Sequence, residues 1–276
     1  MALVIPTNVA SLDAQKSLTR NSAALGRSFA RLSSGFRINT AADDAAGLAI
    51  SESMKAQIRS YTIAERNANE AISMTQTAEA ALGSMHDILG RMRELAIQSS
   101  NGSMTGTDRG YLDTEFTALK EEMARIQGSS KFNGKQLVST TGEQIIFQVG
   151  LNNTASDQIT LTFGGLSLTQ LLAATTNVAG ATAGTALNSI GRIDAAIGII
   201  STERAKYGAA MNRLDVTVSS IQTMRVNLSA ANSRIRDVDV AEETSQLSRN
   251  QVLAQAGTSM LAQANQLPQM AMQLLQ

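Results

Sequence analysis

The sequence predicts a mainly α-helical protein. Both chain ends form a long antiparallel helical rod or coiled coil, and the middle holds a small β-hairpin region. Over both ends, apolar residues recur at alternating three- and four-residue steps, the spacing of one helix face. A period of two is confined to the middle of the chain. Aromatic residues make up only 3% and tryptophan is absent, so the apolar surface is mostly Ala, Leu, Ile and Met, which suits closely packed helices.

The N-terminal part of the chain is predicted to hold two long helices. The apolar stripe of the first helix consists of Leu18, Leu25, Phe29 and Leu32. A second pattern runs from Asp44 to about Ser99 without a proline. Because proline is the strongest interruption of a helix, this favours one very long helix.

A shorter helix and a hairpin are predicted next. Leu112, Phe116 and Met123 share one face of a helix that ends near Gly128. The alternating apolar residues of 145–149 and 159–163 flank the turn-forming sequence GLNNTASD, which predicts a β-hairpin. The small, uncharged segment Gly164–Ala186 is expected to be a surface excursion.

The C-terminal part of the chain is helical again from about Asn188. Heptad-like spacing continues through it, and the apolar stripe of the last helix includes Leu253, Met260, Leu267 and Met270. Helical patterns at both ends, separated by a non-helical middle, predict that the two ends pair with each other.

Both chain ends lack charged side chains. None occurs before Asp13 or after Arg249. Solvated helices normally carry Lys and Glu on their outer face, so these ends are predicted to be assembly surfaces, buried against other copies. Frayed terminal helices are the alternative, and they explain the missing charge less well.

The segment LSSGFRINTAADDAAGLAIS combines glycines, an arginine and paired aspartates. It lacks the spacing of a phosphate-binding loop and no strand precedes it. Gly35 suits the end of one helix, whereas Thr40 as N-cap and Asp43 three residues later suit the start of the next. Asp44 also favours the positive end of that helix. Together with Arg37, these residues are predicted to form a connector rather than a metal or phosphate site.

No catalytic constellation is visible. The chain has no cysteine and a single histidine, His86, so a catalytic triad or a thiolate metal site cannot be assembled. We therefore predict no catalytic, metal-binding or cofactor-binding residues and no enzyme activity. The methionines on the helical stripes are interpreted as packing residues.

Charge and hydropathy narrow the partners. With 23 basic and 23 acidic residues, the chain lacks the basic excess of a nucleic-acid binder. No run of about 18 apolar residues is present, so membrane insertion is not expected. No cleavable signal peptide is visible, which under general secretion rules predicts a cytoplasmic protein unless another export route operates.

Long motifs in this sequence resemble those of bacterial flagellin, the subunit of the flagellar filament. The resemblance covers nearly all of the chain except about 139–186. The matching segments are IPTNVASLDAQKSL, LSSGFRINTAADDAAGLAIS, RNANEAISMTQTAEAAL, RMRELAIQSSNG, FNGKQL, and RIRDVDVAEETSQLSRNQVLAQAGTSMLAQANQLPQ.

The resemblance implies a minimal subunit without large outer variable domains. Its parts would be 1–40, the N-terminal part of an inner-tube coiled coil with a connector; 41–138, the N-terminal part of an outer-tube rod; 139–187, its hairpin and short variable loop; 188–236, the C-terminal rod helix; and 237–276, the C-terminal part of the inner tube. Such a chain would polymerise into the extracellular filament that serves swimming motility.

The resemblance also implies partners. The chain would be secreted unfolded by the flagellar type III apparatus. It would meet an export chaperone at its C-terminal helix, the filament cap, hook-junction proteins, and above all other copies of itself. Arg91, Leu95 and Glu115 match the family's surface for the innate receptor Toll-like receptor 5.

Three alternatives remain. A hook–filament junction protein shares terminal assembly helices with flagellins. A membrane-active C-terminal helix is disfavoured by its lack of Lys and Arg. An enzyme would need its site within 139–186, where Glu143 and Asp157 are the only acidic residues.

Overall fold

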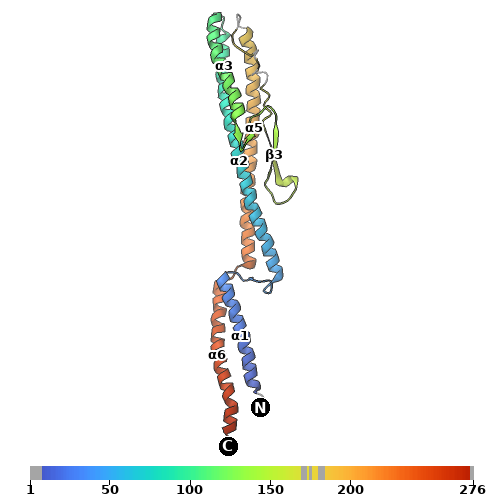
Figure 1. Cartoon of the computed structure of the whole chain (residues 1–276), viewed down its shortest axis with the longest axis vertical. Helices are drawn as coiled ribbons and strands as arrows, with labels where there is room; N and C mark the ends of the chain where they lie inside the picture. The colour runs from blue at the N-terminus through green and yellow to red at the C-terminus, as the bar shows by residue number, and fades with distance from the viewer. Residues whose placement is uncertain (1–7, 169–172, 174–175, 180–183, 274–276) are drawn as a thin grey trace. The chain divides into compact units, whose positions relative to one another are not determined.

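The computed structural model describes residues 8–168, 173, 176–179 and 184–273 of the chain, and the side chains of these residues up to 266 (Figure 1). The segments in this part of the chain are the following, in order: α1 Val9–Ser34, α2 Ala45–Ser99, α3 Gly106–Ser129, β1 Lys131–Phe132, β2 Lys135–Gln136, β3 Glu143–Gln148, a 3-10 turn Ala155–Asp157, β4 Gln158–Phe163, α5 Gly184–Arg236 and α6 Val240–Gln273. The predicted fold class, mainly helical with a small β region, is confirmed.

The chain divides into two compact units. One consists of Met1–Ile58 with Val226–Gln276, and the other of Arg59–Arg225. Both divisions lie inside long helices, α2 and α5, so each of these helices contributes to both units. The borders between the compact units lie at 58/59 and 225/226. The predicted inner-tube and outer-tube domains meet at 40/41 and 236/237, and these borders stay a prediction.

The unit of residues 59–225 holds one apolar core, which follows a heptad pattern. The buried positions of α2 recur mostly every three or four residues from Ala64 to Ala96, and those of α5 recur at steps of three, four or seven residues from Ala186 to Ile221. This repeat keeps one seam of each helix against its neighbour. The core side chains of α2 are mostly alanine up to Ala78 and then larger, from Leu82 onward, along the part of α2 beside which α3 lies (Figure 1).

The predicted hairpin is confirmed as the antiparallel pair β3–β4, with Ile145 opposite Leu161. Every second residue of β4 is buried, ending at Phe163, because one face of the pair packs on the helices. The Phe163 ring lies 5.6 Å from that of Tyr207 on α5, and Asn67 of α2 donates a hydrogen bond to the carbonyl of Gln148.

The segment that follows the hairpin corrects a prediction. Gly164–Ala186 was expected to be a surface excursion, but Leu166, Leu168 and Val178 are fully buried in the core. Asp113 of α3 accepts hydrogen bonds from the backbone N–H groups of residues 178 and 179. The described parts of this segment are therefore packed onto the helices and held there by side chains that precede it in sequence.

The other unit is built on the antiparallel pair of α1 and α6, which lie side by side (Figure 1). The predicted pairing of the two chain ends is thus confirmed. Hydrogen bonds fix the pair at widely spaced points. Asn8 donates to the carbonyl of Ala264, and Asn21 donates to the carbonyl of Asn250.

Candidate assembly interface

The α1–α6 pair leaves much of its apolar surface uncovered. Among the described residues of the two helices, the buried ones are Ser11, Ser28, Glu243 and Ala264, and none of them carries a large apolar side chain. The large exposed apolar residues of the two helices are Val9, Leu12, Phe29, Val240, Val252, Leu253 and Met260. A groove of about 680 Å³ also opens between the helices, lined by Leu18, Ala256 and Gly257 among others. Large apolar side chains left exposed in this number on one helix pair are typical of an interaction site.

The predicted assembly residues occupy two environments. Leu18, Leu25 and Leu32 are half-buried on α1. Phe29, Leu253 and Met260 are at least half exposed. The backbone of Leu267 and Met270 continues α6, whereas their side chains lie outside the described residues. The stripe therefore does not close into a core within one copy.

The connector begins where α1 ends, at Gly35. This residue has φ 74° and donates its N–H to the carbonyl of Arg31, the left-handed cap that glycine adopts without strain. Its carbonyl accepts the N–H of Val238. Arg37 donates its own N–H to Arg236 and its guanidinium to Ile235. The connection from α1 to α2 is thus hydrogen-bonded to the connection from α5 to α6.

The start of α2 differs from the prediction. The first helical residue is Ala45, and Asp44, not Thr40, caps it by accepting the N–H of Gly47 at 2.9 Å. A Cβ on Gly47 would meet the Asp44 carboxylate and the buried Ile38, so the first turn of the helix packs closely on both residues. Thr40 and Asp43 form a turn one step earlier.

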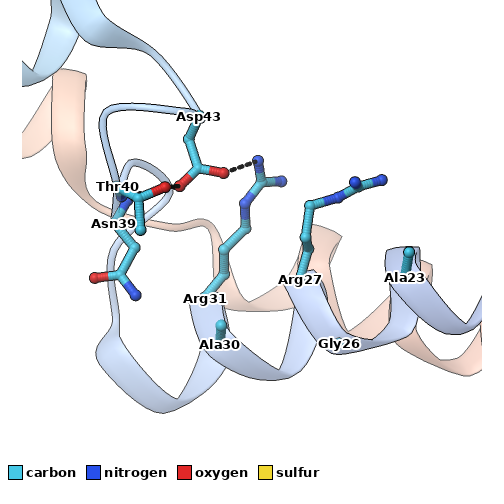
Figure 2. Close-up of a pocket in the computed structure, with 8 residues that line it drawn as sticks. All are labelled: Ala23, Gly26, Arg27, Ala30, Arg31, Asn39, Thr40 and Asp43. Atoms are coloured by element: carbon cyan, nitrogen blue, oxygen red, sulfur yellow. Dashed lines mark hydrogen bonds and ion pairs between the residues drawn. The ribbon is translucent and has the colours of Figure 1, made fainter.

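Asp43 organises that turn. One carboxylate oxygen accepts hydrogen bonds from the backbone N–H groups of Asn39 and Thr40 and from the Thr40 hydroxyl. These bonds, that of the Thr40 backbone first, lower the pKa of the Asp43 carboxyl. The other oxygen faces Arg31 at 4.0 Å, as Figure 2 shows.

Several residues of this junction were not foreseen. Arg31 also lies 3.6 Å from Glu243 of α6, which is buried. The guanidinium of Arg236 covers the Phe36 ring at 4.4 Å and pairs with Glu52. The sequence does show that most charged residues of the chain ends lie near the predicted connector. Which of these residues pair with one another depends on the fold and could not be predicted from the sequence.

The three residues matched to a receptor surface lie on α2 and α3. Arg91 donates a hydrogen bond to Glu115 at 2.8 Å and pairs with Glu94. The side chains of Arg91, Glu94 and Glu115 are exposed. Leu95 is only 1% exposed and belongs to the core. Its side chain therefore cannot touch a partner in this conformation, which corrects the surface drawn from the sequence.

The described residues offer no arrangement for metal chemistry. No group of three or more His, Asp or Glu side chains there could hold an ion. Within the same part of the chain, no helix has the length and hydropathy of a membrane span.

Comparison with known proteins identifies the family. The family described as bacterial flagellin N-terminal helical region matches residues 5–143, and that described as bacterial flagellin C-terminal helical region matches residues 190–275. The chain belongs to the bacterial flagellin family. Flagellins are structural proteins, and the two matched regions contain α1 and the described part of α6.

Relatives match over nearly their whole length. A flagellin of Halalkalibacterium halodurans is 42% identical over 99% of this chain and 100% of its own. A flagellin of Bacillus subtilis is 38% identical, with 97% of this chain and 98% of its own covered. The crystal structure of Bacillus cereus flagellin is 37% identical and aligns with 60% of this chain and 94% of its own, with a TM-score of 0.49. Nothing in these comparisons favours the hook–filament junction alternative.

Proposed function

We propose that this flagellin is a structural subunit that polymerises into the extracellular bacterial flagellar filament through the apolar faces of α1 and α6. The observation that carries the proposal is the set of large apolar side chains that the α1–α6 pair leaves exposed. Neighbouring copies would cover these side chains. In this contact, the exposed apolar face of one copy binds a different surface of the next copy. Such a contact repeats from copy to copy without closing and gives a helical polymer.

Folding and assembly are coupled in this proposal. A helix pair that buries serine, alanine and one glutamate but no large apolar side chain gains little from its own packing. Docking onto other copies adds the missing burial, so the stability of the pair rises with the extent of polymerisation. Because a free subunit lacks this added burial, its α1–α6 pair becomes stable only when it docks onto the filament.

Export follows the same logic. The subunit would leave the cell largely unfolded by the flagellar type III route, with its N-terminal segment as an uncleaved signal. An export chaperone would cover the exposed apolar residues of α6, such as Leu253 and Met260, until the filament cap and hook-junction proteins receive the chain. The absence of cysteine suits this passage, since no disulfide can form on the way.

Engagement of Toll-like receptor 5 is a separate part of the proposal. The exposed pair of Arg91 and Glu115 supports it, and the buried Leu95 would hold α2 against the core rather than touch the receptor. A receptor-reporter assay with purified monomer should give a signal that falls for Arg91→Ala. A silent wild-type monomer would refute this part alone.

Seeded polymerisation tests the central proposal. The full chain and a version lacking about thirty residues from each end are added to filament fragments and viewed by electron microscopy. We expect only the full chain to elongate the seeds. The trimmed chain should retain the unfolding transition of the 59–225 unit, which shows that its failure concerns assembly. Filaments of the trimmed chain would overturn the proposal.

A further inference from the structure

The methionines of the chain differ widely in exposure. Those in the core of the 59–225 unit are at most 4% exposed: Met74, Met85, Met92 and Met123. Three more are half-buried: Met54, Met104 and Met211. Among the residues whose side chains the structure describes, the exposed methionines are Met224, at 50%, and Met260, at 63%. A small oxidant in solution therefore reaches these two thioethers first.

Met260 lies on the surface that the α1–α6 pair leaves open. It lines the groove of about 680 Å³ between these helices, one turn after Ala256 and Gly257. A Cβ on Gly257 would touch Leu18 of α1 at 3.4 Å, so the two helices approach closely beside Met260. Of the large apolar side chains that line the groove, Met260 is the most exposed, followed by Leu253 at 52%. A copy that covers the groove would therefore also shield the sulfur of Met260.

Met224 is exposed at a different place. It belongs to α5 and to the 59–225 unit, and it does not line the groove. Among the described side chains, Met260 is the one methionine of the groove. The chain thus offers two accessible thioethers of similar exposure, one on the proposed assembly face and one outside the α1–α6 pair. Comparing the two separates a blocked groove from general oxidative damage.

Oxidation of Met260 changes the chemistry of the groove in one step. Hydrogen peroxide transfers one oxygen atom to the thioether sulfur. The O–O bond of the peroxide breaks, an S=O bond forms and water leaves, so that sulfur loses two electrons and the peroxide is reduced. The resulting sulfoxide is polar, whereas the α6 residues beside it in the groove are Leu253, Ala256 and Gly257. Burying a polar group against such neighbours costs free energy that burying a thioether does not.

We propose that Met260 is a reversible oxidation site that controls polymerisation of this chain. The inference rests on the proposed assembly through α1 and α6. In the free subunit the Met260 sulfur is open to peroxide, and its sulfoxide prevents the next copy from covering the groove. In the filament the covered sulfur is protected, so oxidation acts on subunits that have not yet been added. Reduction of the sulfoxide returns such a subunit to the pool that can polymerise.

Peroxide treatment of purified monomer tests the site. After the peroxide is removed, peptide mass spectrometry measures the oxidised fraction of each methionine, and sedimentation of seeded filaments measures the subunit concentration left in solution. We expect Met224 and Met260 to be oxidised well before the four core methionines. The concentration left in solution should rise about tenfold for the wild type. Treatment with both methionine sulfoxide reductases, one for each epimer, should reverse the rise.

Two matched variants assign the effect to one residue. Met260→Leu conserves volume and removes the sulfur, so it should polymerise before treatment and change by less than about twofold after it. Met224→Leu makes the same substitution at the other exposed methionine and should keep the rise of about tenfold seen in the wild type. A treated Met260→Leu chain that loses polymerisation as the wild type does would overturn the proposal, as would protection by Met224→Leu.

A comparison of monomer with filament tests the same site without any substitution. Met260 should be oxidised at least about tenfold more slowly in finished filaments than in the monomer, because a neighbouring copy covers the groove. Equal rates would overturn the proposal, and so would a rise in the concentration left in solution that persists after the reductases have removed the sulfoxide. An untreated wild-type chain that fails to elongate seeds would refute the proposed function itself, so the two failures are distinguishable.

Discussion

Polar substitution of two exposed residues of α6 should raise the concentration needed for polymerisation without unfolding the monomer. Leu253 is 52% and Met260 63% exposed in the single chain. Full burial of a side chain of this size contributes about 1.5–3 kcal/mol, so covering the remaining half of each contributes about 1 kcal/mol. Leu253→Ser with Met260→Ser should then weaken addition of a subunit by about 2 kcal/mol, or about 30-fold in critical concentration.

Sedimentation measures this change directly. Filaments are brought to equilibrium, pelleted, and the concentration of subunit left in solution is taken as the critical concentration. Gln251→Ser is the matched control, because it alters an exposed polar position of the same helix and should leave the critical concentration unchanged. An unchanged value for the double variant would refute the conclusion that these apolar residues drive assembly.

Three further changes test residues at the ends of α1, α2 and α3. Gly35→Ala should destabilise the end of α1 by about 1 kcal/mol, since φ 74° strains any residue with a Cβ and no neighbour offsets the strain; a lower depolymerisation temperature of the filament would show it. Arg109 is buried and donates hydrogen bonds to the carbonyls of Ser99 and Asn101 at the end of α2. Arg109→Met should lower the free energy of unfolding of the monomer by about 2 kcal/mol, measured by thermal unfolding, whereas Arg125→Met at an exposed position should lower it little. Hydrogen bonds from the Thr105 hydroxyl and backbone N–H lower the pKa of Asp108 in the folded chain. The Asp108 carboxylate therefore stabilises the fold above the unfolded-state pKa of about 3.9, and this contribution is lost as the pH falls through the lower pKa of the folded state. Asp108→Ala should melt at a lower temperature than the wild type at pH 7 and at the same temperature in strong acid.

The positions of the long helices could be predicted from the sequence because heptad spacing is a local pattern. The buried seam of α2 from Ala64 to Ala96 repeats it without a break. The hairpin was accessible for the same reason, since alternation and turn residues lie within a few positions of one another. Both features depend on neighbours in sequence.

The segment after the hairpin was not accessible. Its small uncharged residues resemble a loop, yet Leu166 and Val178 are buried, and Asp113 and Ser99 hold its backbone. These partners are many tens of residues away along the chain, and no spacing rule connects them. The prediction of Thr40 as the helix cap was wrong, since Asp44 caps α2 beside a Gly47 that packs too closely on Ile38 for a Cβ to fit.

The small residues between α1 and α6 have a consequence for alignment. Serine and alanine side chains interlock weakly, so the apolar contact alone would let the two helices slide past each other by a turn. The hydrogen bonds of Asn8, Ser11 and Asn21 to α6 act only at one alignment. Within this pair, specificity of register is therefore held by amides and hydroxyls, and a redesign that replaced them with larger apolar groups would gain adhesion while losing the single correct alignment.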